Sequence, residues 1–157
     1  MSGARRKTLS HARDRTELVR RLRTLNAQSP RQWGKMSAHQ MVCHLADACG
    51  MATGDKRVTS AANRLPPVVM KWIGLYLPLR WPPGIETRPE IDQRCGGTRP
   101  GDFASDLARV EALLDRMATL DQDFAWPTHP VFGRMSRSEW LRWGYLHTDH
   151  HLRQFDA

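Results

Sequence analysis

The chain has 157 residues, a length that suits a single domain with one hydrophobic core. Its formal net charge is +8, and hydrophobic residues make up 40% of it. The apolar run at residues 68–79 is short, contains Lys71 and is bracketed by prolines, so we expect no membrane-spanning segment. The start of the chain lacks the apolar stretch of a secretory signal, and its three cysteines form no Cys-x-x-Cys pair. These features predict a protein of the reducing cytoplasm.

The positive charge is concentrated at the N-terminus. Residues 1–35 contain ten Lys or Arg against two acids, Asp14 and Glu17, whereas the rest of the chain carries 14 of each. Such a segment either contacts nucleic acid or another anionic surface, or is a solvated helix face after a disordered tail. The lack of interleaved aromatic residues favours the second interpretation. We therefore expect residues 1–9 to be a disordered basic arm and residues 10–157 to be a single helical domain.

The first half of the chain predicts three helices. One runs from about Ser10 or Asp14 to Leu25, with leucines along one face. A second begins after Ser37, which forms a capping box with Gln40, and ends near Gly54. A third, short helix spans about residues 67–77 and is apolar nearly all round. It either covers the bundle or forms a dimer contact.

The second half begins with a long connection at residues 78–101 that is rich in Pro and Gly. A regular amphipathic helix follows at residues 102–120, to which we assign no chemistry. The last helix runs from Ser136 to Phe155 and opens with a second capping box, formed with Glu139. No strand pattern is visible, so the sequence predicts an all-α bundle of four long helices and one short one.

Candidate metal ligands lie on the last helix. His147 and His151 are one turn apart on the same face, and two such imidazoles can bind one metal ion. The chain has seven histidines, so this pair needs a third ligand on another helix before it indicates a site. His44 lies on the apolar face of the second helix, where an unpartnered imidazole is costly to bury. On the residues alone, a hydrogen-bonded core histidine is favoured over a ligand at that position.

Other polar residues could support these histidines. Gln154 continues the face of His147 and His151 and could hold a ligand or a water molecule. Asp47 follows His44 by one turn and could orient its imidazole, or could equally be a surface acid. Asp149 is a weaker candidate for the same kind of role. His150 also lies within one turn of His147, so its participation is left open.

Three separated motifs carry a family resemblance: MVCHLADA around His44, HPVFGRMS at 129–136 and YLHTDHHLRQF at 145–155. They resemble the DinB-like superfamily of YfiT-like, metal-dependent four-helix bundles, in particular a bacterial branch of unknown function. The resemblance implies an up-down-down-up helix course and one divalent metal per chain. By position it assigns His44, His147 and His151 as the ligands. Three imidazoles suit zinc best, with nickel or iron as alternatives.

The resemblance also implies a class of function. Three neutral imidazoles leave a metal ion its charge and an open position, which lowers the pKa of a bound water or thiol. We therefore expect a hydrolase, or an S-transferase using a low-molecular-weight thiol, that acts on a small molecule as a homodimer. One alternative is a metal-binding or stress-related binding module without turnover. Another is a nucleic-acid-associated bundle that uses Arg5, Arg6 and Lys7, which predicts salt-sensitive binding.

Overall fold

The computed structural model describes residues 5–157, and within them it contains five α-helices and no β-strand. The expectation of an all-α protein is therefore confirmed. The helices are α1 (Ala12–Leu22), α2 (Ala38–Ala52), α3 (Pro67–Tyr76), α4 (Phe103–Thr119) and α5 (Arg137–Gln154). A single turn of 3₁₀ helix, η1 (Pro89–Ile91), interrupts the long Pro- and Gly-rich connection.

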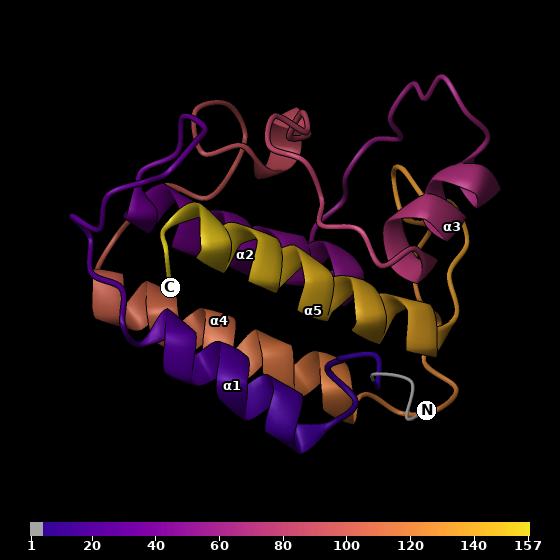
Figure 1. Ribbon diagram of the computed structural model, residues 1–157, viewed down its shortest axis with the longest axis horizontal. Helices are drawn as coiled ribbons and strands as arrows, with labels where there is room; N and C mark the ends of the chain where they lie inside the picture. The colour runs from indigo at the N-terminus through magenta and orange to yellow at the C-terminus, as the bar shows by residue number, and fades with distance from the viewer. Residues whose placement is uncertain (1–4) are drawn as a thin grey trace.

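The four longer helices pack on one another, and α3 lies apart from them against one end of α5 (Figure 1). Helix α2 contacts both α4 and α5, and α1 contacts the same two helices. The core forms where their apolar faces meet. Its largest fully buried side chains include Leu18 and Leu22 of α1, Leu114 of α4 and Trp140 of α5. Helix α2 is the most deeply enclosed, since 13 of its 15 residues are buried.

Both predicted capping boxes are present. The Ser37 hydroxyl accepts from the Gln40 amide, and the Gln40 side chain accepts from the Ser37 amide. Ser136 and Glu139 form the same pair at the start of α5. These boxes satisfy backbone amides that have no partner within the helix, and so they define where the two histidine-bearing helices begin. Gly54, with φ of +81°, follows the end of α2 as expected.

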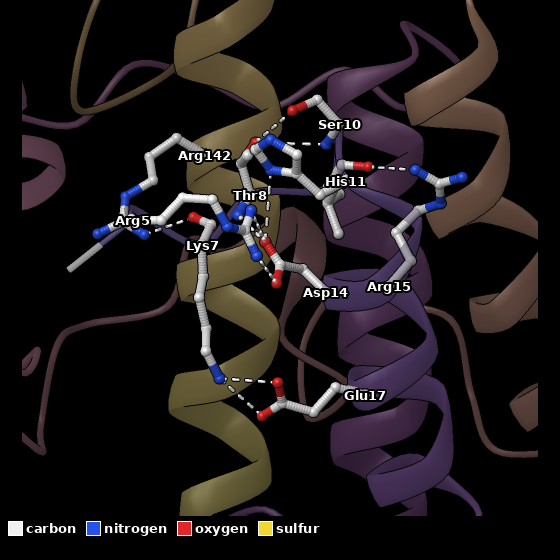
Figure 2. A network of polar contacts seen from close by, with 10 residues as sticks. Arg5, Lys7, Thr8, Ser10, His11, Asp14, Arg15, Glu17 and Arg142 are labelled. Atoms are coloured by element: carbon white, nitrogen blue, oxygen red, sulfur yellow. Dashed lines mark hydrogen bonds and ion pairs between the residues drawn. The ribbon is translucent and has the colours of Figure 1, made fainter. Parts of the chain in front are cut away.

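Residues 5–9, part of the segment that we expected to be a disordered arm, pack against the helices, while residues 1–4 lie outside the described part of the chain. Leu9 is fully buried against Gly144 of α5, where an added Cβ would stand 2.5 Å from the Leu9 side chain. Arg5 pairs with the buried Asp14 at 2.8 Å, and Lys7 pairs with Glu17 at 2.7 Å (Figure 2). This anchoring depends on one leucine and two ion pairs, which a survey of local composition does not detect.

The same contacts change the expected basic surface. Near the end of α1, Arg21 pairs with Asp149. Arg23, the residue just after the helix, pairs with Glu111. Arg5 and Lys7 thus lie beside acids of α1, and Arg21 and Arg23 lie beside acids of α5 and α4. This pairing leaves less of the N-terminal positive charge free for an anionic partner. Among residues 5–157, no helix combines the length and the hydropathy that a bilayer crossing requires.

An apolar surface is concentrated around α3. Among the residues that the structure describes, the large hydrophobic side chains that are exposed all belong to residues 65–85: Leu65, Val68, Val69, Trp72, Ile73, Tyr76, Leu79 and Ile85. Only Leu75 of α3 is buried. This helix therefore covers little of the bundle, and its outer face remains available for contact.

Candidate metal centre

Three histidines from two helices meet inside the bundle. His44 comes from the middle of α2, and His147 and His151 come from successive turns of α5. One ring nitrogen from each lies within 4.8 Å of the other two. His44 is 2% exposed and His151 is 9% exposed. The structure therefore brings together the three residues that the resemblance had assigned as ligands.

Their separation fits a metal ion. The Nε2 atoms of His44 and His147 are 3.2 Å apart. Two imidazole nitrogens bound at about 2.0–2.1 Å with tetrahedral angles stand about 3.3–3.4 Å apart. The His44 ring is 4.7 Å from the His151 ring and 5.1 Å from the His147 ring, measured between centroids. His44 and His147 thus stand at nearly the spacing that one small ion requires, and His151 supplies a third nitrogen within 4.8 Å of both.

Hydrogen bonds orient two of the three rings. His44 Nδ1 lies 2.8 Å from the Ile91 carbonyl oxygen of η1, which can only accept, so Nδ1 carries the proton and Nε2 is left with its lone pair. The Gln154 Nε2 atom donates to the Trp33 carbonyl, which turns the Gln154 Oε1 atom towards His151 Nδ1 at 2.9 Å. His151 is therefore also protonated at Nδ1. Donation of the second ring nitrogen to an oxygen is the usual arrangement of metal-binding histidines.

Gln154 is thus a hydrogen-bond partner of His151, and in this arrangement it is not itself a metal ligand. It is 5% exposed, and both ends of its amide are occupied by His151 and by the loop before α2. Gly34 leaves room for this contact, because its φ is +80° and an added Cβ would stand 2.5 Å from the Gln154 nitrogen. The loop at residues 31–35 therefore holds the end of α5 through the residue that orients His151.

Asp47 does not orient His44 by direct contact, so that prediction is corrected. The carboxylate is 2% exposed and accepts from Gln93 Nε2 at 2.9 Å, from the Thr98 amide at 2.7 Å and from the Thr98 hydroxyl at 2.6 Å. Lys56 lies 3.0 Å from it. The alternative of a surface acid is excluded by its burial. Asp47 instead anchors the loop after η1, and η1 supplies the Ile91 carbonyl that orients His44.

The electrostatics of the group favour neutral rings. Burial lowers the pKa of His44, His147 and His151, and for His147 the neighbouring imidazoles lower it further. A metal ion binds the neutral form of imidazole, so these histidines are in the binding state at neutral pH. The ring of His147 also stacks on Trp143 at 4.8 Å with an angle of 14° between the planes. Trp143 thereby restricts the His147 ring, for which the described residues provide no hydrogen bond to a backbone carbonyl or a side-chain amide.

A cavity of about 400 Å³ opens beside the three histidines. Its walls come from α3, from the segment at residues 79–88 and from the turn at residues 129–132. The turn is closed by paired backbone bonds between His129 and Gly133, whose φ is +69°. His129 Nδ1 accepts from the amides of Val131 and Phe132 at 3.1 and 3.0 Å, and burial lowers its pKa to about 3. His129 therefore shapes the cavity wall as a neutral ring.

His150 lines the same cavity but is not part of the three-histidine group. Its ring packs near Trp81 and Trp33, with centroids 6.1 and 5.9 Å away. Burial lowers its pKa to about 4, and its buried Nδ1 atom has no hydrogen-bond partner among the described residues. Arg88 also lines the cavity, whereas three polar residues that follow it, Glu90, Gln93 and Arg94, bind Thr59, Asp47 and Asp92.

A second polar cluster joins α2 to α4 and was not predicted. His39 Nε2 lies 2.7 Å from Asp106 Oδ2, which also accepts from the Gly101 amide and lies 3.6 Å from Cys43 Sγ. The His39 side chain is only 15% exposed. Asp106 comes from the helix to which no chemistry had been assigned. Burial raises the pKa of Cys43 to about 12, as expected for a structural thiol.

Asp149 faces away from the histidines. It binds Arg21 at 2.6 Å and Arg153 at 3.0 Å. Its proposed role at the site is therefore replaced by a structural one, since it ties α5 to α1.

The chain belongs to a family of proteins of unknown function, DUF1569, whose model matches residues 4–157. Comparisons with curated proteins and with solved structures find no match. The family assignment covers both histidine-bearing helices and the loops that support them. It supplies no activity, so the geometry of the site carries the functional argument.

Proposed function

We propose that this member of the DUF1569 family is a metal-dependent enzyme holding one divalent transition metal per chain, zinc in first place and nickel or iron as alternatives. His44, His147 and His151 are the proposed ligands. The observation that carries the proposal is the convergence of three neutral imidazoles, those of His44 and His151 buried and that of His147 partly buried, at the wall of a cavity of about 400 Å³. Sites of this size commonly take small molecules.

The fold belongs to the same proposal. We infer a DinB-like bundle with an up-down-down-up course, in which α2 supplies one histidine and the last helix supplies two. The four packed long helices and the distribution of His44, His147 and His151 support this inference. A solved structure in which the helix directions differed would contradict it.

The protein side chains prepare the site for chemistry. Ile91 and Gln154 each bind an Nδ1 atom, which leaves the Nε2 lone pairs of His44 and His151 free to bind a metal. Trp143 and Phe132 provide apolar walls that limit the access of water. When bound there, a divalent metal supplies Lewis acidity to a water or thiol in its open position. Hydrolysis, or transfer to a low-molecular-weight thiol, is the reaction class that such a site supports.

The test is the metal content of protein purified without a histidine tag or added metal. We expect about one transition metal per chain in the wild type and none in His147→Ala. His11→Ala is the matched control, because the His11 side chain is 46% exposed and lies far from the group in the chain. Absence of metal from the wild type, with no uptake of zinc or nickel on titration, would refute the proposal.

A screen for turnover separates an enzyme from a binding module. Metal-loaded wild type is assayed for ester and amide hydrolysis and for thiol consumption with electrophilic acceptors. Turnover that His147→Ala lacks and His11→Ala retains would support catalysis. Full metal occupancy without turnover on any substrate class would favour the alternative, a metal-binding module without catalysis.

A further inference from the structure

We propose that the cavity beside the three histidines binds a mostly apolar small molecule with a single hydrogen-bonding group, and that it excludes highly charged thiols. This inference rests on the proposed function, because it names the substrate class of the same site. The cavity walls would bind the body of the substrate, whereas the metal would act on its reacting group. The two can therefore be tested separately.

The walls of the cavity are mostly apolar. Side chains of Met70, Ile73, Trp81, Val131, Phe132 and Trp143 line the cavity. The charged residues at its edge, Arg80, Glu86 and Arg88, all lie in the segment at residues 80–88. Arg80 and Glu86 are exposed, and Arg88 is occupied by the carbonyl and hydroxyl of Thr59. Because water screens an ion pair with Arg80 or Glu86 at the exposed edge, an anionic or zwitterionic ligand would gain little there for the hydration that it loses inside the cavity.

The cavity is continuous with the exposed apolar surface around α3. Ile73, Leu79 and Ile85 line the cavity and are also 39%, 64% and 55% exposed. A molecule that contacts the outer surface of α3 can therefore enter between apolar side chains. Apolar contact along the entry path favours an apolar body over a polar one.

One nitrogen of the His150 ring, Nδ1, has no hydrogen-bond partner among the described residues. The ring lines the cavity, and its buried Nδ1 has no partner within residues 5–157. A buried polar atom without a partner is unfavourable, and a small rotation of the His150 ring towards the cavity would let a ligand hydrogen-bond to it and relieve this penalty. His150 is thus the proposed anchor for the one polar group of the ligand, close to the three-histidine group.

The first experiment uses the neutral fluorophore N-phenyl-1-naphthylamine as an apolar probe. We expect binding to wild type, about tenfold weaker binding to Trp81→Ala, and unchanged binding to Trp72→Ala. Trp72 is the matched control because it lies on the same apolar surface, is 57% exposed and does not line the cavity. Equal loss in both variants would place the probe on the outer surface and overturn the proposal.

Competition then defines the ligand class. We expect benzyl mercaptan to displace the probe at a concentration about tenfold or more below that of reduced glutathione. Displacement by glutathione at equal or lower concentration would overturn the proposal. Probe binding is measured on metal-loaded and on chelator-stripped protein. Probe binding that persists in stripped protein supports an apolar cavity even if the metal content refutes the proposed function. A protein that binds neither the probe nor a metal would refute both proposals, each by its own measurement.

The second experiment tests His150. Benzyl alcohol and toluene have similar size and differ by one hydroxyl group. We expect their affinity ratio to shift about tenfold towards toluene in His150→Phe compared with wild type. Circular dichroism confirms that the variant is folded, and His11→Phe serves as the matched control. An unchanged ratio in a folded His150→Phe protein would remove His150 from the ligand-binding role.

Discussion

Replacement of Gln154 by Leu tests how the protein orients a metal-binding imidazole. The substitution keeps the approximate size of the side chain but removes the bonds of 2.9 Å to His151 Nδ1 and to the Trp33 carbonyl. Two neutral hydrogen bonds at about 1 kcal/mol each predict a loss of about 2 kcal/mol in the free energy of unfolding. The loss of an orienting partner predicts metal affinity reduced about 10- to 100-fold, or about 1.4–2.7 kcal/mol.

Affinity is measured by competition with a chromophoric chelator at pH 7.5, and stability by urea unfolding of chelator-stripped protein. Asp149→Asn is the control, because Asp149 lies on the same helix and binds Arg21 and Arg153. It should leave metal affinity unchanged. A Gln154→Leu variant with wild-type affinity would refute the positioning role. Loss of all binding, as in His147→Ala, would show that Gln154 is itself a ligand.

Three further predictions concern stability and association. Asp47→Asn should lower the free energy of unfolding by about 3 kcal/mol, since the bonds from Gln93 and Thr98 lose a charged acceptor; an unchanged urea midpoint would contradict this. His129 has a folded pKa of about 3 against 6.5 ordinarily, so the unfolded chain takes up the proton first and stability falls as pH drops below about 6.5. His129→Asn should therefore reduce the slope of stability against pH, between pH 5 and 6, by about 1.4 kcal/mol per pH unit, and an unchanged slope would exclude His129 as the titrating group. We propose that the exposed surface of α3 forms a homodimer, so Trp72→Glu should convert a dimer to a monomer in sedimentation velocity, whereas a monomeric wild type would refute the dimer.

The outline of the site follows from local sequence. The capping boxes at Ser37 and Ser136 predict where the two histidine-bearing helices begin, because each depends on residues only three positions apart. The i,i+4 spacing of His147 and His151 places both rings on one face of α5 in any fold. The apolar face around His44 likewise predicts that this imidazole is buried. These inferences needed periodicity and capping chemistry alone.

The supporting contacts depended on tertiary structure. Ile91 is 47 positions from His44, and its contribution is a backbone carbonyl, which leaves no signature in the identity of the residue. Asp47 could be read as an orienting carboxylate or a surface acid, and only the docking of the 93–98 loop decided that it anchors that loop.

The same reason accounts for the remaining differences between prediction and structure. The N-terminal segment looked disordered because a basic composition is visible locally, while the space that Leu9 fills beside Gly144 is created by α5 at the other end of the chain. Asp106 meets His39 and Cys43 only because α4 packs on α2. Helical periodicity is thus a property of neighbouring residues, so the helices and the faces that carry the histidines could be predicted before the fold was known. The partners that orient those histidines, and the cavity beside them, arise from the packing of distant segments, so they become visible only in the folded chain.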